Sequence, residues 1–254
     1  MDYGSIIKYV GSRFSSCYSN YNYYSYIGTW LDWYKGNIKS FHTIKVSNGL
    51  TTPTREIYSL KMAKRVCEDW ASSMLNEDVK IVISSTNKKS SIFVQGSKSN
   101  GGVLGSNNFE VLLSDTLEQM FALGTSAFVI DLDNIAVDEN GNIVDGSRAT
   151  IKIKGVNATR IIPISWSNGV VSEASFISEM TVNNKTYYIV SSHIKEEDGY
   201  VIYNDLLDNN YKTARLNINL LPCIRTKSFK PLFYIMKTNI SNNIDLDSPL
   251  GISV

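Results

Sequence analysis

FEVLLSDTLEQMFALGTSAFVI, residues 109–130, is the stretch where the chain changes from helix to strand. Its first part has apolar residues at helical spacing, and the inward-facing set is Phe109, Leu112, Leu113, Leu117, Met120 and Phe121. Gly124 suits the left-handed position that commonly ends a helix. Residues 125–130 then resemble a strand, so we expect helices before this point and strands after it.

The segment after this junction has the pattern of an antiparallel meander. Ile151 and Ile153 alternate with Lys152 and Lys154, as in a strand with one buried face. Turn signals recur at Glu139-Asn140-Gly141, Ser167-Asn168-Gly169, Asn183-Asn184 and Glu196-Glu197-Asp198-Gly199. The spacing of these signals predicts short strands joined by hairpins.

Two helices are predicted upstream. Ile6, Val10 and Phe14 recur at helical spacing and indicate a short first helix. A longer helix is expected over 52–76, with Thr52 as its cap and Pro53 at its first position. Its apolar face comprises Leu60, Ala63, Val66, Cys67, Trp70, Ala71, Met74 and Leu75. We expect this face to be buried, so that Trp70→Ala costs roughly 3–5 kcal/mol.

Shorter features complete the predicted order. A strand is expected over 79–83 and a polar loop over 97–108. We therefore predict an α+β fold with N-terminal helices followed by an antiparallel β-rich meander. The expected parts are an aromatic-rich arm (1–50), a helical part (51–130), a β-rich part (131–236) and a C-terminal connector (237–254). We find no internal repeat.

The composition of the chain limits the classes of protein to which it can belong. The chain has 254 residues, 43% of them hydrophobic, which suits a folded core. Its 25 basic and 24 acidic residues leave a net charge of +1, which gives no strong attraction to nucleic acid. We see neither a signal peptide nor a membrane-spanning apolar run. We expect a soluble protein, made in a cytoplasm, that has no membrane partner.

Two motifs resemble ligand sites but are incomplete. Gly96-Ser97-Lys98-Ser99 follows an expected strand over 92–95 and resembles part of a P-loop, but the upstream glycine is absent. Residues 138–142 resemble the start of a calcium loop, but the sixth and twelfth positions hold Ile143 and Ala149. We interpret the second motif as a hairpin turn and expect no cofactor at the first.

Four residues could supply nucleophile chemistry: Cys67, Cys223, His42 and His193. None lies in a recognisable nucleophile motif, and neither histidine has a carboxylate at a telling spacing. The three cysteines, which include Cys17, form no pair with zinc-ligand spacing. We therefore expect structural roles for these residues, with no catalytic residue, no cofactor and no metal site.

Tyrosines gather near the N-terminus, at Tyr18, Tyr21, Tyr23, Tyr24 and Tyr26. Aromatic arms can stack on bases, but such sites also need a basic groove. Only Arg13 and Lys35 lie nearby in the sequence. We therefore favour a packing or subunit-contact arm.

Several unusual strings follow one another in a fixed order. They are WLDWYKG (30–36), LKMAKRVCEDWA (60–71), NE (76–77), ALGTSAF (122–128), IPISWSNG (162–169), NN (242–243) and SPLGISV (248–254). Together they resemble the portal proteins of long-tailed phages and prophages of Gram-positive bacteria. The resemblance runs from Trp30 to the end of the chain and corresponds to the N-terminal, wing-containing portion of a portal subunit.

The resemblance implies a structural role. Portal subunits form a ring, usually a dodecamer, at one vertex of the virion capsid, and the ring is the channel for genome packaging and ejection. The implied partners are terminase, scaffold and major capsid protein, a head-completion or adaptor protein, and double-stranded DNA that passes without sequence specificity. Such a subunit is not an enzyme. The alternative from another class is a β-rich phage or bacterial hydrolase.

Asp247-Ser248-Pro249 near the C-terminus is a helix-entry signal, with Ser248 as cap and Pro249 at the first helical position. The resemblance implies that a long stem helix follows in the full subunit. We therefore expect this chain alone to form monomers or loose oligomers and not a stable ring.

Overall fold

Helices come first and antiparallel sheets follow in the computed structural model, which describes residues 2–47, 49–76, 87–97 and 101–254. In this part of the chain the α-helices are α1 (Tyr3–Phe14), α2 (Tyr21–Lys35), α3 (Met62–Met74), α4 (Lys88–Gln95), α5 (Gly102–Ser106) and α6 (Phe109–Leu123). The predicted α+β class is confirmed. The expected first helix and the expected 109–123 helix are also confirmed.

Two antiparallel sheets form the β part. The larger has the order β11-β10-β9-β8-β7, with bounds Cys223–Arg225, Gly199–Leu207, Lys185–Glu196, Val170–Val182 and Ile161–Ser167. The smaller has the order β12-β3-β6, with bounds Phe233–Lys237, Thr125–Asp133 and Thr150–Asn157. A short 3-10 helix, Ala158–Arg160, leads from β6 into β7. A small hairpin pairs β4 (Ala136–Val137) with β5 (Ile143–Asp145), and a second pairs β1 (Thr43–Lys45) with β2 (Thr54–Glu56).

The four predicted turn signals all fall between paired strands. Asn168 and Gly169 join β7 to β8, and both have positive φ, at 51° and 72°. Asn183 and Asn184 join β8 to β9 with φ of 50° and 58°. Two central residues of positive φ match the twist of paired strands, and asparagine and glycine tolerate this conformation best. The predicted meander is therefore confirmed.

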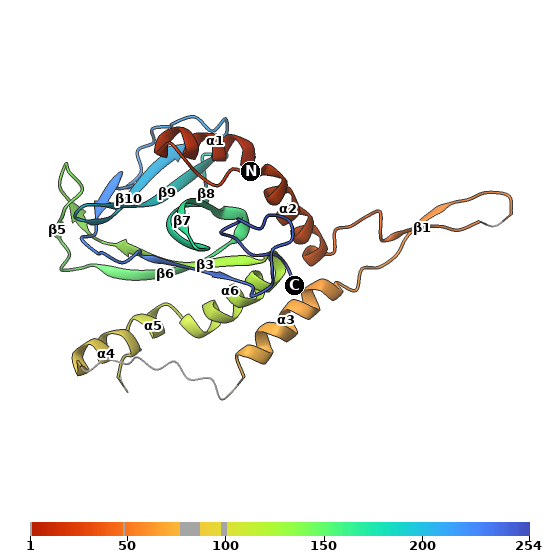
Figure 1. Ribbon diagram of the computed structural model, residues 1–254, viewed down its shortest axis with the longest axis horizontal. Helices are drawn as coiled ribbons and strands as arrows, with labels where there is room; N and C mark the ends of the chain where they lie inside the picture. Colours follow the sequence, from red (N-terminus) through yellow and green to blue (C-terminus); the bar gives the residue numbers. More distant parts are fainter. Residues whose placement is uncertain (1, 48, 77–86, 98–100) are drawn as a thin grey trace.

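The molecule is layered (Figure 1). The three-stranded sheet lies between the five-stranded sheet on one side and α6 with α3 on the other. Between the sheets, Phe176 of β8, His193 of β9 and Phe233 of β12 are all buried and in ring contact. On the helix side, a Cβ on Gly155 of β6 would lie 2.5 Å from Thr116 Oγ1 of α6, so α6 lies directly on the sheet.

Three of the N-terminal tyrosines, Tyr18, Tyr23 and Tyr24, pack inside their own chain, whereas Tyr21 and Tyr26 are exposed. Tyr23 and Tyr24 on α2 are buried, and Tyr24 donates a hydrogen bond of 3.2 Å to the carbonyl of Ile161. Tyr23 donates to the carbonyl of Gly251, and Tyr18 donates to Asp245 at 2.6 Å. The buried tyrosines thus attach α2 to β7 and to the C-terminal segment, which is the first of the two roles, packing or subunit contact, that the sequence favoured.

The predicted helix over 52–76 is wrong in its first ten residues. The helix begins at Met62, and Thr52, Pro53 and the following residues belong to a hairpin in which Thr54 pairs with Lys45. β-branched residues fit strands better than helices, and the pairing partner lies too far upstream for a local helical period to reveal. The predicted strand over 79–83 falls outside the described residues.

Two further expectations are corrected. Residues 92–95 are the end of helix α4 and not a strand, because the Asn87 side chain accepts a hydrogen bond of 3.0 Å from Lys89 N and starts a helix there. The expected loop over 97–108 contains α5. Of the expected part boundaries, 50/51 falls inside the β1–β2 hairpin, 130/131 inside β3 and 236/237 inside β12.

The C-terminal segment contains no helix after Pro249, so the helix entry expected at Ser248 is not formed within this chain. Ser248 Oγ does accept a hydrogen bond of 3.1 Å from Leu250 N, as a cap would. The segment instead packs against the body, with Leu250 buried and Val254 N donating to the Phe121 carbonyl at 3.1 Å. A glycine pair allows this packing, because a Cβ on Gly124 would lie 2.4 Å from Gly251 O.

We predict that Gly124→Ala destabilises the fold. Gly124 has φ of 77°, and an L-residue there costs about 1–2 kcal/mol before any overlap with Gly251 is added. Gly28→Ala is the matched control, because a Cβ added to Gly28 in helix α2 would meet nothing within 4 Å, and it should gain about 0.5–1 kcal/mol. Urea unfolding of both variants measures the two effects. Equal stability of the two would contradict the close approach.

Candidate functional site

The two candidate thiols lie in surroundings that keep them protonated. Cys67 is buried on α3, and burial raises the pKa of its thiol to about 11, with the nearby Glu118 carboxylate adding to the rise. Burial also raises the pKa of Cys223 on β11. Among the described residues, neither thiol has a hydrogen bond to a histidine. A raised pKa keeps both thiols protonated, which makes them poor nucleophiles.

His42 and His193 differ in their surroundings. His42 stands at the base of the β1–β2 hairpin, with its ring 5.2 Å from that of Phe41, and it lines an open pocket that also includes Glu56. His193 is fully buried between the two sheets, and neither of its ring nitrogens has a hydrogen-bond partner among the described residues. Burial lowers the pKa of His193 to about 4, although the Asp131 charge works in the opposite direction.

The residues that resemble a calcium loop form a closed turn. The Asp138 carboxylate accepts hydrogen bonds from Asn140 N at 2.9 Å, from Asn142 N at 2.8 Å and from Asn142 Nδ2 at 3.0 Å. These bonds lower the pKa of Asp138. The carboxylate is thus engaged within its own turn. In the described ranges, no three His, Cys, Asp or Glu side chains gather closely enough to hold a metal ion.

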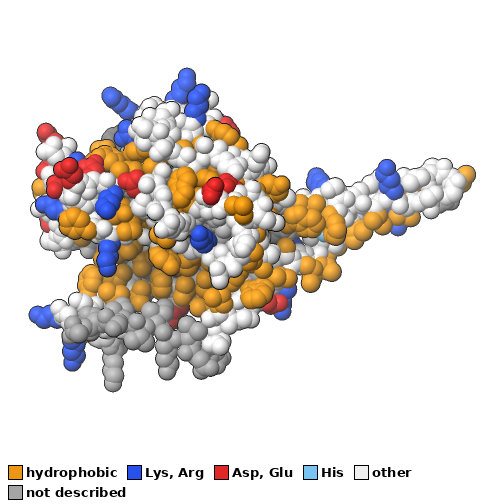
Figure 2. Space-filling model, viewed as in Figure 1, with side chains coloured by type: hydrophobic (Ala, Val, Ile, Leu, Met, Phe, Trp, Pro, Cys, Tyr) orange, Lys and Arg blue, Asp and Glu red, His pale blue; other side chains and the backbone are white. Residues whose placement is uncertain are grey.

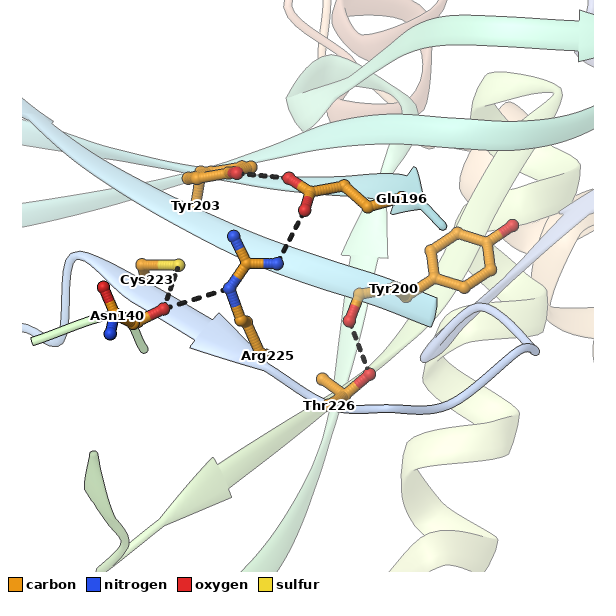
Figure 3. A network of polar contacts seen from close by, with 7 residues as sticks. All are labelled: Asn140, Glu196, Tyr200, Tyr203, Cys223, Arg225 and Thr226. Carbon is orange, nitrogen blue, oxygen red and sulfur yellow. Dashed lines mark hydrogen bonds and ion pairs between the residues drawn. The ribbon is translucent and has the colours of Figure 1, made fainter. Parts of the chain in front are cut away.

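Figure 3 shows the polar network that attaches this turn to the larger sheet. Arg225 of β11 donates from Nε to the Asn140 carbonyl at 3.0 Å and from Nη1 to Glu196 Oε2 at 2.6 Å. Tyr203 of β10 donates to the other oxygen of Glu196, and these bonds from Tyr203 and Arg225 lower the pKa of that carboxyl. These bonds join residues of β9, β10 and β11 and the turn between β4 and β5. The network therefore holds these four elements together.

The segment that resembles a P-loop has the wrong local structure for one. Gly96 follows helix α4 directly, with φ of 87°, whereas a P-loop glycine follows a strand. Lys98 and Ser99 lie outside the described residues.

The clearest unusual feature is a surface, which we call the α3 stripe: Met62, Val66, Trp70 and Met74. The stripe follows from their spacing of four residues along one helix. All four side chains are exposed, whereas Cys67 and Ala71 on the adjoining face are buried against the body. Trp70 is 51% exposed, although its ring contacts Phe121 at 6.0 Å. The expectation that the whole apolar face is buried is therefore wrong, because the body of the chain covers only part of it.

The second uncovered surface is the hairpin of residues 37–61, which projects from the body (Figure 1). Figure 2 shows apolar side chains along one side of this hairpin and continuing onto the body. Leu50 is 95% exposed and Tyr58 86% exposed, and none of the described residues from 39 to 62 is buried. The sequence analysis missed this surface, because residues 52–61 were expected to belong to a helix and residues 37–50 to the N-terminal arm.

The comparisons with known proteins add no relative. No protein-family model matches the chain, and a search of curated proteins finds no match either. None of the helices in the described residues is long and apolar enough to cross a membrane.

We predict that Trp70→Ala costs much less than a core truncation. Hydrophobic stabilisation scales with the area removed from water, and half of Trp70 stays in water. We expect a loss below about 2 kcal/mol for Trp70→Ala, against about 2–5 kcal/mol for Leu123→Ala in the core. Guanidinium unfolding of dilute protein measures both. A loss in Trp70→Ala as large as in Leu123→Ala would show that the stripe is covered within one chain.

We predict that His193 makes the fold sensitive to acid. Its folded pKa of about 4 lies below the ordinary value of 6.5, so between these pH values the unfolded chain binds the extra proton. Stability therefore falls as the pH drops from 6.5 to 4, by about 3 kcal/mol from this group. His193→Phe should remove much of that loss in urea unfolding at pH 7 and pH 4.5, while His42→Phe should not. An unchanged pH dependence in His193→Phe would refute the assignment.

Proposed function

We propose that this chain is the wing-containing part of a portal subunit, a structural component of the head-tail connector ring of a tailed bacteriophage. The structural observation that supports this proposal is the presence of two uncovered apolar surfaces, the α3 stripe and the 37–61 hairpin. Large exposed apolar areas on a folded chain are typical of assembly interfaces. The ordered strings from WLDWYKG to SPLGISV support the proposal, because they resemble those of portal proteins.

The placement of the chemistry-bearing residues supports a structural role over the hydrolase alternative. Cys67 and His193 are buried in different layers, on α3 and between the two sheets. The Arg225–Glu196 network uses its polar groups to join strands. A ring subunit needs stable strands and repeated side contacts, and it needs no nucleophile with an adjacent base.

The proposed setting is the virion, at the capsid vertex where the genome enters and leaves. The ring, usually dodecameric, would meet terminase during packaging, and later the head-completion or adaptor protein. Scaffold and major capsid protein would contact its outside. A chain of net charge +1 also suits a channel wall along which double-stranded DNA moves without being held.

We predict that negative-stain microscopy of the longest natural product of this gene shows closed rings with a central channel. The reason is that portal subunits would contact one another through unlike surfaces, and such a heterologous contact forms a ring when the rotation between neighbours closes. Uniform monomers at all concentrations would contradict the proposal. A hydrolytic turnover that disappears in Cys67→Ala, Cys223→Ala, His42→Ala or His193→Ala would favour the hydrolase.

A further inference from the structure

We propose that the hairpin of residues 37–61 is a clasp that lies on the α3 stripe of a second copy of this chain. The inference adds detail to the proposed function. That the contact repeats to form a ring rests on the proposed function. It assigns the contact between neighbours to two named surfaces.

The hairpin needs a cover from outside its own chain. Its strands pair only over Thr43–Lys45 and Thr54–Glu56, with flanking bonds from Val46 N to Pro53 O (3.0 Å) and from Ile57 N to His42 O (2.6 Å). A two-stranded ribbon with no packed face is marginally stable in water. The hairpin therefore gains stability when its apolar side chains are buried against a partner.

One face of the ribbon is suited to such burial. Because side chains alternate along a strand, Ile44, Val46 and Ile57 lie on the same face. The opposite face carries Thr43, Lys45, Thr54 and Glu56 along the paired strands. Along the paired strands the hairpin thus has one mainly apolar face, interrupted by Arg55, and one mainly polar face, while Phe41 and Tyr58 are exposed just beyond the strands.

The α3 stripe is apolar and exposed, like the apolar face of the hairpin, and the hairpin of the same chain does not cover it. The hairpin leaves the body near the start of α3 and points away from it, while α3 runs in the other direction (Figure 1). A hairpin can therefore reach the stripe of a neighbouring copy but not that of its own chain. Since the two surfaces differ, the contact is heterologous and repeats from one copy to the next.

Charge complementarity favours a second copy as the occupant. Residues 37–61 hold four basic side chains (Lys39, Lys45, Arg55, Lys61) and one acidic side chain (Glu56), which leaves +3. Because the whole chain carries +1, the remainder carries −2. Helix α6, which packs along α3, exposes Glu110 and Asp115, and neither is in an ion pair among the described residues. On α3 itself Lys64 and Arg65 are in ion pairs with Glu68 and Asp69, so the charges of these two helices that have no ion pair within the described ranges, Glu110 and Asp115, are acidic and complement the basic ribbon.

The test uses two double variants of the full chain. The hairpin variant is Ile44→Asp with Ile57→Asp, and the stripe variant is Val66→Asp with Trp70→Asp. Burying a carboxylate without a partner is costly, so each variant alone should raise the dissociation constant of self-association at least about tenfold in sedimentation velocity. The matched control, Thr43→Asp with Thr54→Asp, adds the same charge to the polar face and should change it less than about twofold.

Mixing the two variants gives the decisive measurement. Each mixed pair keeps one intact hairpin and one intact stripe, so an equimolar mixture should form heterodimers and nothing larger. Three outcomes would overturn the clasp: a wild-type chain that stays monomeric at every concentration, self-association that survives in the stripe variant, or a mixture without heterodimers. Circular dichroism of each variant confirms that it is folded.

The outcomes also separate this inference from the proposed function. If the longest gene product forms channel-bearing rings that survive both double substitutions, the clasp is refuted and the portal proposal stands. If the mixture forms heterodimers but the longest gene product forms no ring, the clasp stands and the portal proposal fails.

Discussion

The structure depends on the left-handed turn at Gly124, where helix α6 ends and strand β3 begins. Four parts of the chain meet there. Thr238 N donates to the Gly124 carbonyl at 3.1 Å, and Gly251 N donates to Thr125 Oγ1 at 2.8 Å. Tyr23 of α2 donates to the Gly251 carbonyl. The turn places α6 under the smaller sheet and leaves room for the C-terminal segment, so the two ends of the chain are held by one backbone conformation that glycine adopts without strain.

Local signals account for what the sequence predicted well. The 109–123 helix, its glycine end and the asparagine-rich hairpin turns were predicted correctly because each depends on residues a few positions apart. The first ten residues of the expected 52–76 helix were predicted wrongly because their pairing with residues 43–45 is not visible in a local sequence window. The exposure of Trp70 was missed for another reason: a periodic pattern shows that a face is apolar, but not whether anything in the same chain covers it.

The contacts of the candidate residues show that several of them have structural roles. The carboxylate of Asp138 holds its own turn, Arg225 joins that turn to Glu196, and His193 fills space between two phenylalanine rings. The sequence could predict the turn at Asp138 from its Asn-Gly pair, but no local signal indicated that Arg225 would reach it from 85 residues away. The two uncovered apolar surfaces are among the features that the fold itself leaves unexplained, and these are what the proposed assembly uses.

The open hairpin also bears on how the chain avoids aggregation. A two-stranded ribbon has unpaired backbone groups along both edges, and such edges invite strand addition by identical chains. Here the ribbon carries a charge of +3, so two ribbons brought edge to edge repel each other. The positive charge that would attract the ribbon to an acidic helix surface therefore also opposes the pairing of identical ribbons into a larger sheet.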